Sequence, residues 1–139
     1  MDDGSTGSLS KEVVLSEGGW NQNFARVLLI EEHGGQAVAL VDGNGDGAEL
    51  ELEYWTREGA STWVCATSSG YSGLGTLGPA EAWTAGTHVV ALGKVAPGTY
   101  VHLSYAGDTH TRQANEFGIW GFIAPADPES PDELPIVTS

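Results

Sequence analysis

The sequence predicts an all-β protein, a single-domain antiparallel β-sandwich, with a small β-barrel as the alternative arrangement of the same strands. Short apolar runs rich in Val, Leu, Trp and Tyr are separated by Gly-rich clusters, and no helical period lasts longer than about ten residues. Residues 101–105 alternate between apolar and polar side chains, which is typical of a strand with one buried face. A chain of 139 residues can bury an independent core without disulfides or metal ions.

Nine short strands are expected, and each is bounded by turn residues. Residues 33–35 and 44–47 close the first hairpins, because Gly and Asn tolerate the positive φ of tight turns. The continuous apolar run 27–30 indicates a central strand that is buried on both faces. Turns at residues 96–98 and 106–109 bound the last hairpins. The expected strands are residues 12–16, 24–32, 36–41, 48–56, 61–67, 87–93, 99–105, 109–114 and 118–123.

The two ends of the chain differ in composition from the expected sandwich domain at residues 11–123. Residues 1–10 are small, polar and rich in Gly and Ser, so we expect a flexible N-terminus. Residues 124–139 carry four of the six prolines and several acids, so we expect an acidic, Pro-rich flexible tail. The segment 68–86 is longer than an ordinary connection, which indicates a functional or disordered loop. Within it, residues 79–83 are expected to form one helical turn that starts at a proline.

The chain is strongly acidic, with 19 acidic and five basic side chains and a formal charge of −14. This charge repels phosphate backbones, so the sequence argues against nucleic-acid binding. No apolar run approaches the roughly 18 residues that a membrane span needs. The N-terminus lacks the basic and apolar regions of a secretory signal, so a cytoplasmic location is expected, or an extracellular one if a leader was removed.

Residues 91–123 resemble the bacterial immunoglobulin-like domains that recur in adhesins and other surface proteins. The resemblance is carried by Gly93, Pro97, Gly98, Val101, Leu103, Gly107, Gly118, Trp120 and Phe122. It implies a β-sandwich in which Trp120 and Phe122 pack in the core beside Val101 and Leu103. It also implies an adhesive or partner-binding module without catalysis. The longer N-terminal part of the chain departs from this pattern, so we carry over the fold and not the role.

Residues 42–47 match the opening of a calcium-binding loop, with acidic or amide side chains at alternate positions and Gly between them. The residues after the loop alternate as a strand, so Glu53, at the twelfth position, lies roughly 23 Å of contour beyond the last loop Asp. A calcium ion would therefore use nearer ligands. We expect these to be Asp42, Asn44, Asp46 and Glu49, with the Ala48 carbonyl. The alternative is a Gly-rich hairpin turn without metal, and no cofactor is required.

Other motifs give weaker signals, and no catalytic residue is expected. Residues 73–78 fit G-x-G-x-x-G but lack the preceding strand and following helix of a nucleotide site. A nucleophile elbow at residues 70–74 would need Gly where Leu74 stands. The four histidines are scattered, without the spacing of zinc ligands. Cys65 is the single cysteine and lies in an apolar run, so a buried structural thiol is expected.

Five tryptophans in so short a chain suggest either core packing or a flat binding surface. Trp63 and Trp120 lie in apolar strands and are interpreted as core residues. Alternation places Trp55 on the outward face of its strand, where it shares that face with three glutamates. An exposed ligand-binding set would consist of Trp20, Trp55, Tyr71 and Trp83.

The leading hypothesis is a non-catalytic binding or protein–protein interaction module whose contact surface is the 68–86 loop with its nearby aromatic residues. Its partner would be a protein or a carbohydrate. One alternative is a small β-barrel enzyme or cyclase-like protein with an aromatic-lined cavity, although a role without catalysis is favoured. A second is a calcium-stabilised carbohydrate-binding or adhesive module. A third is a homo-oligomer formed through the edges of its sheets.

Overall fold

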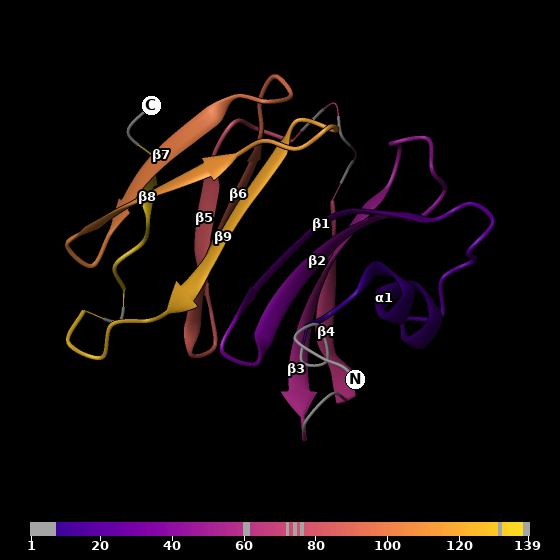
Figure 1. Cartoon of the computed structure of the whole chain (residues 1–139), viewed down its shortest axis with the longest axis horizontal. Helices are drawn as coiled ribbons and strands as arrows, with labels where there is room; N and C mark the ends of the chain where they lie inside the picture. Colours follow the sequence, from indigo (N-terminus) through magenta and orange to yellow (C-terminus); the bar gives the residue numbers. More distant parts are fainter. Residues whose placement is uncertain are drawn as a thin grey trace, which may run out of the picture. The chain divides into compact units, whose positions relative to one another are not determined.

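The computed structural model of the chain describes residues 8–59, 62–71, 73, 75, 77–130 and 132–137. These residues form three antiparallel sheets, which confirms the all-β class (Figure 1). None of these described sheets closes on itself, so the alternative of a small barrel is wrong. The chain divides into two compact units, unit 1 at residues 1–76 and unit 2 at residues 77–139. The division falls within the segment expected to be one long loop.

Unit 1 is a four-stranded antiparallel meander with one helix against its face (Figure 1). Its strands pair in the order β1-β2-β3-β4. The elements are α1 (Lys11–Glu17), β1 (Arg26–His33), β2 (Gln36–Asp42), β3 (Leu50–Glu58) and β4 (Thr62–Tyr71). The strands predicted at 24–32, 36–41, 48–56 and 61–67 are therefore confirmed, with small shifts at their ends.

The first element of unit 1 is a helix, and the strand predicted at residues 12–16 is wrong. Ser10 precedes the helix in an extended conformation, and its Oγ accepts a hydrogen bond of 3.2 Å from the N–H of Val13. This N-cap satisfies one of the backbone donors that a short helix leaves unpaired, and Glu12 adds an acidic side chain in the first turn. Val14 is fully buried in the core of unit 1. Capping and one buried side chain therefore outweigh the β-branched composition of this segment.

The core of unit 1 lies between the sheet and the segment that contains α1. Alternate residues of β2 face this core, and Trp55 and Trp63 from β3 and β4 fill it. β2 is the strand with buried residues on both faces, whereas the prediction assigned that role to the 27–30 run of β1. A register shift between Val27 and Leu29 explains the difference, since β1 stands first in the sheet order and its apolar run spans an irregularity.

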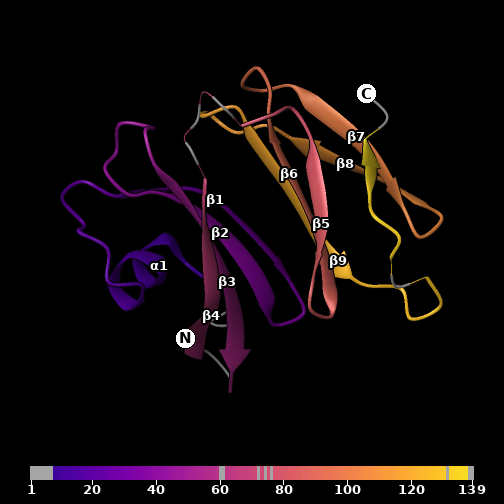
Figure 2. The ribbon, with the colours of Figure 1, turned by 180° about the vertical axis from the view of Figure 1, so that it is seen from behind.

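Unit 2 is a small sandwich of two three-stranded sheets, with strand orders β5-β6-β9 and β10-β7-β8 (Figure 2). Its strands are β5 (Glu81–Ala85), β6 (His88–Lys94), β7 (Tyr100–Tyr105), β8 (Asp108–Gln113), β9 (Ile119–Pro125) and β10 (Ile136–Val137). Trp120 and Phe122 from one sheet pack with Val101 and Leu103 from the other. These core positions agree with the packing that the resemblance implied, and the strands predicted at 87–93, 99–105, 109–114 and 118–123 are confirmed.

Two parts of unit 2 differ from the prediction because long-range pairing orders them. Residues 81–85 form β5 beside β6, where a helical turn at 79–83 was expected. The expected flexible tail contains β10, which pairs with β7, and Leu134 packs against the core. The Glu133 carboxylate also accepts a hydrogen bond of 3.2 Å from the N–H of Ala106. The predicted loop 68–86 shortens accordingly, since β4 extends to Tyr71 and β5 begins at Glu81.

The helices were also compared with the length and apolar character that a membrane-spanning helix needs. Across the described ranges, no helix is long and apolar enough to cross a membrane. The helix α1 spans seven residues.

Candidate functional site

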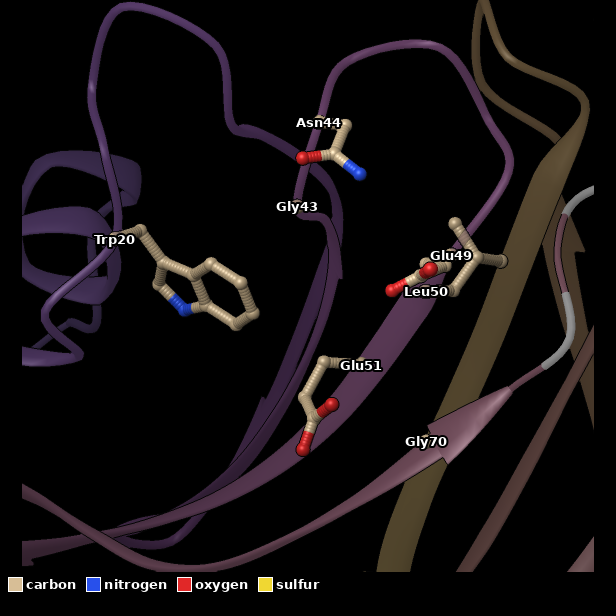
Figure 3. A pocket seen from close by; sticks show the side chains of 7 residues that line it. All are labelled: Trp20, Gly43, Asn44, Glu49, Leu50, Glu51 and Gly70. Carbon is tan, nitrogen blue, oxygen red and sulfur yellow. The ribbon is translucent and has the colours of Figure 1, made fainter.

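Unit 1 contains a pocket of about 300 Å³ that lies between the loop after α1, the turn between β2 and β3, and the facing ends of β3 and β4 (Figure 3). It combines one aromatic ring, one amide and two carboxylates. The residues that line it are Trp20, Gly43, Asn44, Glu49, Leu50, Glu51 and Gly70. We refer to it below as the Trp20 pocket.

The Trp20 ring is held in place from two sides. Its indole N–H donates a hydrogen bond of 3.0 Å to Oε2 of Glu53 on β3. Gly43 lies against the ring, and a Cβ at Gly43 would come within 2.9 Å of the ring carbon Cζ3. A Cβ at Gly18 would lie 3.0 Å from the ring carbon Cδ1. The two glycines therefore leave room for an indole that the hydrogen bond to Glu53 orients.

Glu53 is a buried carboxylate, 4% exposed, that joins the N-terminal segment to the sheet. Its Oε2 accepts from Trp20, and its Oε1 accepts a hydrogen bond of 3.1 Å from the indole N–H of Trp55. Burial raises the pKa of Glu53 above the usual 4.5, the two indole donors oppose this rise, and the negative charge of Glu51 adds to it. Both carboxylate oxygens therefore have an indole donor.

Glu49 and Glu51 bring negative charge to the wall of the pocket. Glu51 is half-buried on β3 and faces Gly70 on β4, where a Cβ would lie 3.9 Å from its Oε1. Figure 3 shows the Glu51 carboxylate, the Trp20 ring and the Asn44 amide around one opening. Within the described part of the chain, neither Glu49 nor Glu51 forms an ion pair. The pocket therefore carries negative charge that no described cation compensates.

Asp42 shapes the turn that forms one rim of the pocket. Its carboxylate is fully buried and pairs with the Arg26 guanidinium, with 3.0 Å between Nε and Oδ2. It also accepts hydrogen bonds from the N–H of Gly45 at 3.0 Å and of Gly47 at 2.9 Å. Both glycines have positive φ, 78° and 77°, which other residues rarely adopt. Asp42 is thus the internal acceptor around which the Gly-rich turn folds.

The four expected calcium ligands do not converge in this structure. Asn44 and Glu49 line the Trp20 pocket, whereas Asp42 is engaged inside its own turn. Asp46 accepts a hydrogen bond of 3.0 Å from the N–H of Ala48. No group of three or more His, Cys, Asp or Glu side chains among the described residues could hold a metal ion. Calcium binding to this turn stays a prediction.

The residues of the expected aromatic platform lie in different surroundings. Trp20 lines the pocket, but Trp55 is 1% exposed and packs in the core of unit 1. Trp55 does share a face with Glu53, as predicted, but α1 and the following loop cover that face, because residues expected as a strand form a helix. Trp83 is half-buried on β5 in unit 2. The side chain of Tyr71 lies outside the described residues.

The sequence pattern did not show the link between Trp20 and Glu53, and it placed Glu53 on an outward face, too far along the strand to complete the calcium loop. The signal was a glutamate two positions before a tryptophan on one strand face, which places a carboxylate beside an indole donor. Trp20 itself is 33 residues away, so no local pattern identifies it. Cys65 is half-buried against the same core, and burial raises the pKa of its thiol, which agrees with an inert structural thiol.

Comparisons of this chain with models of protein families, with curated proteins and with solved structures give no match. The resemblance of residues 91–123 to bacterial immunoglobulin-like domains therefore stays a prediction. The function has to be argued from the geometry of the Trp20 pocket.

Proposed function

We propose that this chain is a non-catalytic binding module whose contact site is the Trp20 pocket. The observation that carries the proposal is an aromatic ring held beside two carboxylates that have no ion-pair partner among the described residues. Binding sites combine an apolar or aromatic wall with a few fixed polar groups. A tryptophan fixed by a hydrogen bond loses little conformational freedom when a ligand packs against it.

The pocket is better suited to binding than to catalysis. Glu53 is the carboxyl group with a raised pKa, but it does not line the pocket, and both its oxygens accept indole hydrogen bonds. A general acid or base must come within hydrogen-bond reach of the reacting group. Among the described residues that line the pocket, none is His, Cys, Ser or Lys. The alternative of a small-barrel enzyme also rested on a closed sheet, which the described strands do not form.

This proposal moves the contact surface from the predicted 68–86 loop to the Trp20 pocket. Gly70 is the part of that segment that lines the pocket, and Trp20 replaces the four-residue aromatic set. A carbohydrate would use the same features, because sugars stack on tryptophan and bond to amides and carboxylates. It is therefore included in the test.

The test is a ligand titration of the ¹⁵N-labelled full chain, read at the Trp20 indole N–H and the amides of Asn44 and Glu51. The panel contains N-acetylarginine methylamide, N-acetylglutamate methylamide and maltotriose. We expect at least one member to shift these three signals together in a saturable manner. Tyr100 is 59% exposed in unit 2, and Tyr100→Ala, as the control variant, leaves the titration unchanged. If no member shifts the pocket signals, the proposal is wrong.

A further inference from the structure

We infer that the Trp20 pocket recognises a cationic side chain, the guanidinium of Arg or the ammonium of Lys, carried by a partner protein. This inference rests on the proposed function, since it names the ligand of the same site. Three properties of the pocket support a cationic ligand: its charge, its hydrogen-bonding groups and its aromatic wall.

The charge of the pocket is negative and uncompensated. Glu49 and Glu51 contribute two carboxylates to the wall, and Glu53 lies behind the Trp20 ring. The ion pair between Arg26 and Asp42, in the described part of unit 1, does not involve them. A guest cation would supply the partner that both wall carboxylates lack, through charge-assisted hydrogen bonds.

The pocket offers acceptors more than donors. The indole N–H of Trp20 already donates to Glu53, so it is committed to the protein. The Asn44 amide is the one lining side chain, among those described, that can donate to a ligand. An anionic or acceptor-rich ligand would find few donors there. A guanidinium or ammonium group carries donors only, which matches the two carboxylates and the amide oxygen.

The aromatic wall fits the same guest. A cation within about 6 Å of an indole centroid is attracted by the negative face of the ring, and Trp is the strongest of the aromatic residues in this respect. The hydrogen bond to Glu53 places this ring before any ligand arrives. Arg and Lys can also lay their methylene groups along the ring while the charged end reaches the carboxylates.

A protein side chain is the source that we favour over a free amine. The cavity of about 300 Å³ is at the small end of ligand pockets, and it suits one side chain that anchors a larger contact. The formal charge of −14 attracts a basic protein surface from a distance and speeds its encounter with the chain. A free amine would gain affinity only from its contacts inside the pocket, without the contribution of a larger basic surface.

The experiment compares three probes on the ¹⁵N-labelled full chain: the Nα-acetyl methylamides of arginine, of lysine and of citrulline, the last being the neutral isostere of arginine. We expect the cations to shift the Trp20 indole signal with an affinity at least roughly tenfold higher than that of citrulline, as the loss of one charge-assisted contact implies. The affinity should fall as salt is added. If citrulline binds as tightly as arginine, the inference is wrong, although the proposed binding function survives.

Variants and a second source complete the test. Glu51→Gln should weaken arginine binding roughly tenfold, and Glu49→Gln, at an exposed position, should weaken it without risk to the fold. Glu58→Gln, at the exposed far end of the same strand, is the matched control and should have no effect. To distinguish a protein side chain from a free amine, the affinity of acetyl-Gly-Gly-Arg-Gly-Gly-amide for the chain is compared with that of spermidine.

The outcomes separate the two proposals. Tighter binding of the peptide supports a protein partner, whereas tighter binding of spermidine overturns that part of the inference in favour of a free amine. Binding that Glu49→Gln and Glu51→Gln leave unchanged overturns the assignment of the cation to this pocket. If none of the cations, N-acetylglutamate methylamide and maltotriose shifts any pocket signal, the proposed function itself fails.

Discussion

The hydrogen bond between Trp20 and Glu53 gives the most direct prediction about what holds the pocket together. The variant Trp20→Phe keeps an aromatic ring but removes the indole N–H, which leaves one oxygen of the buried Glu53 carboxylate without a described donor. Hydrogen bonds to a charged group contribute about 1.5–3 kcal/mol, and a buried acceptor that loses its donor costs a similar amount. We therefore expect the free energy of unfolding to fall by about 2 kcal/mol at pH 7.

The assay is urea unfolding followed by far-UV circular dichroism, together with a thermal melt. For a chain of this length, about 2 kcal/mol corresponds to a decrease in Tm of roughly 4–8 °C. The control variant Tyr100→Phe removes a polar group from an exposed ring and should stay within about 0.5 kcal/mol of the wild type.

The pH dependence of Trp20→Phe follows from the same geometry. Loss of one donor raises the pKa of Glu53 further in the folded state, so the folded variant takes up a proton more readily than the wild type does. Its deficit in stability should therefore shrink as the pH is lowered from 7 toward 4.5, the usual pKa of Glu. A variant as stable as the wild type at both pH values would refute the argument that this hydrogen bond holds the loop.

Three further predictions concern single groups of unit 1. Glu53→Gln should remove a pH dependence of the free energy of unfolding. Burial raises the pKa of Glu53 in the folded state, so the wild type should lose stability relative to the variant as the pH rises above 4.5. A difference in urea unfolding that does not change with pH would contradict this. Asp42→Asn should lower the free energy of unfolding by about 2–4 kcal/mol, because it weakens the bonds to Arg26 and to two backbone N–H groups. The matched control Asp46→Asn, at an exposed position with one backbone donor, should cost less than about 1 kcal/mol in the same unfolding assay. A thermal melt in EDTA and then in millimolar calcium tests the predicted calcium loop: a rise in Tm of several degrees that Glu49→Gln abolishes would establish the loop, and an unchanged Tm would leave Asp42 as the internal acceptor of a turn without metal.

The strands were predictable where their signal is local. Alternation and turn glycines identified eight of the strands, whereas the core positions of Trp120 and Phe122 were implied by the resemblance of residues 91–123 to bacterial immunoglobulin-like domains. The strands β5 and β10 were not predictable in this way, because their order comes from pairing with β6 and β7. The helix α1 was missed because its short apolar run was interpreted as a strand, whereas Ser10 caps a helix.

The candidate site was only partly predictable for a similar reason. Asn44 and Glu49 were selected as calcium ligands, and the structure places both on the wall of the Trp20 pocket. The same pattern of Asp and Gly that suits a calcium loop also suits a turn in which a buried Asp accepts backbone N–H groups, and sequence alone does not separate the two. The link from Trp20 to Glu53 spans 33 residues and depends on the helix that the sequence reasoning read as a strand.

The central claim is that the Trp20 pocket binds a ligand and that the ligand is cationic. It is tested most directly by the Trp20 indole N–H signal of the ¹⁵N-labelled chain during titration with N-acetylarginine methylamide and with its citrulline counterpart. We expect arginine to shift this signal in a saturable manner, and citrulline to bind with an affinity at least roughly tenfold lower. Glu51→Gln should weaken the binding of arginine. An indole signal that ignores arginine, or that responds equally to both probes, would contradict it.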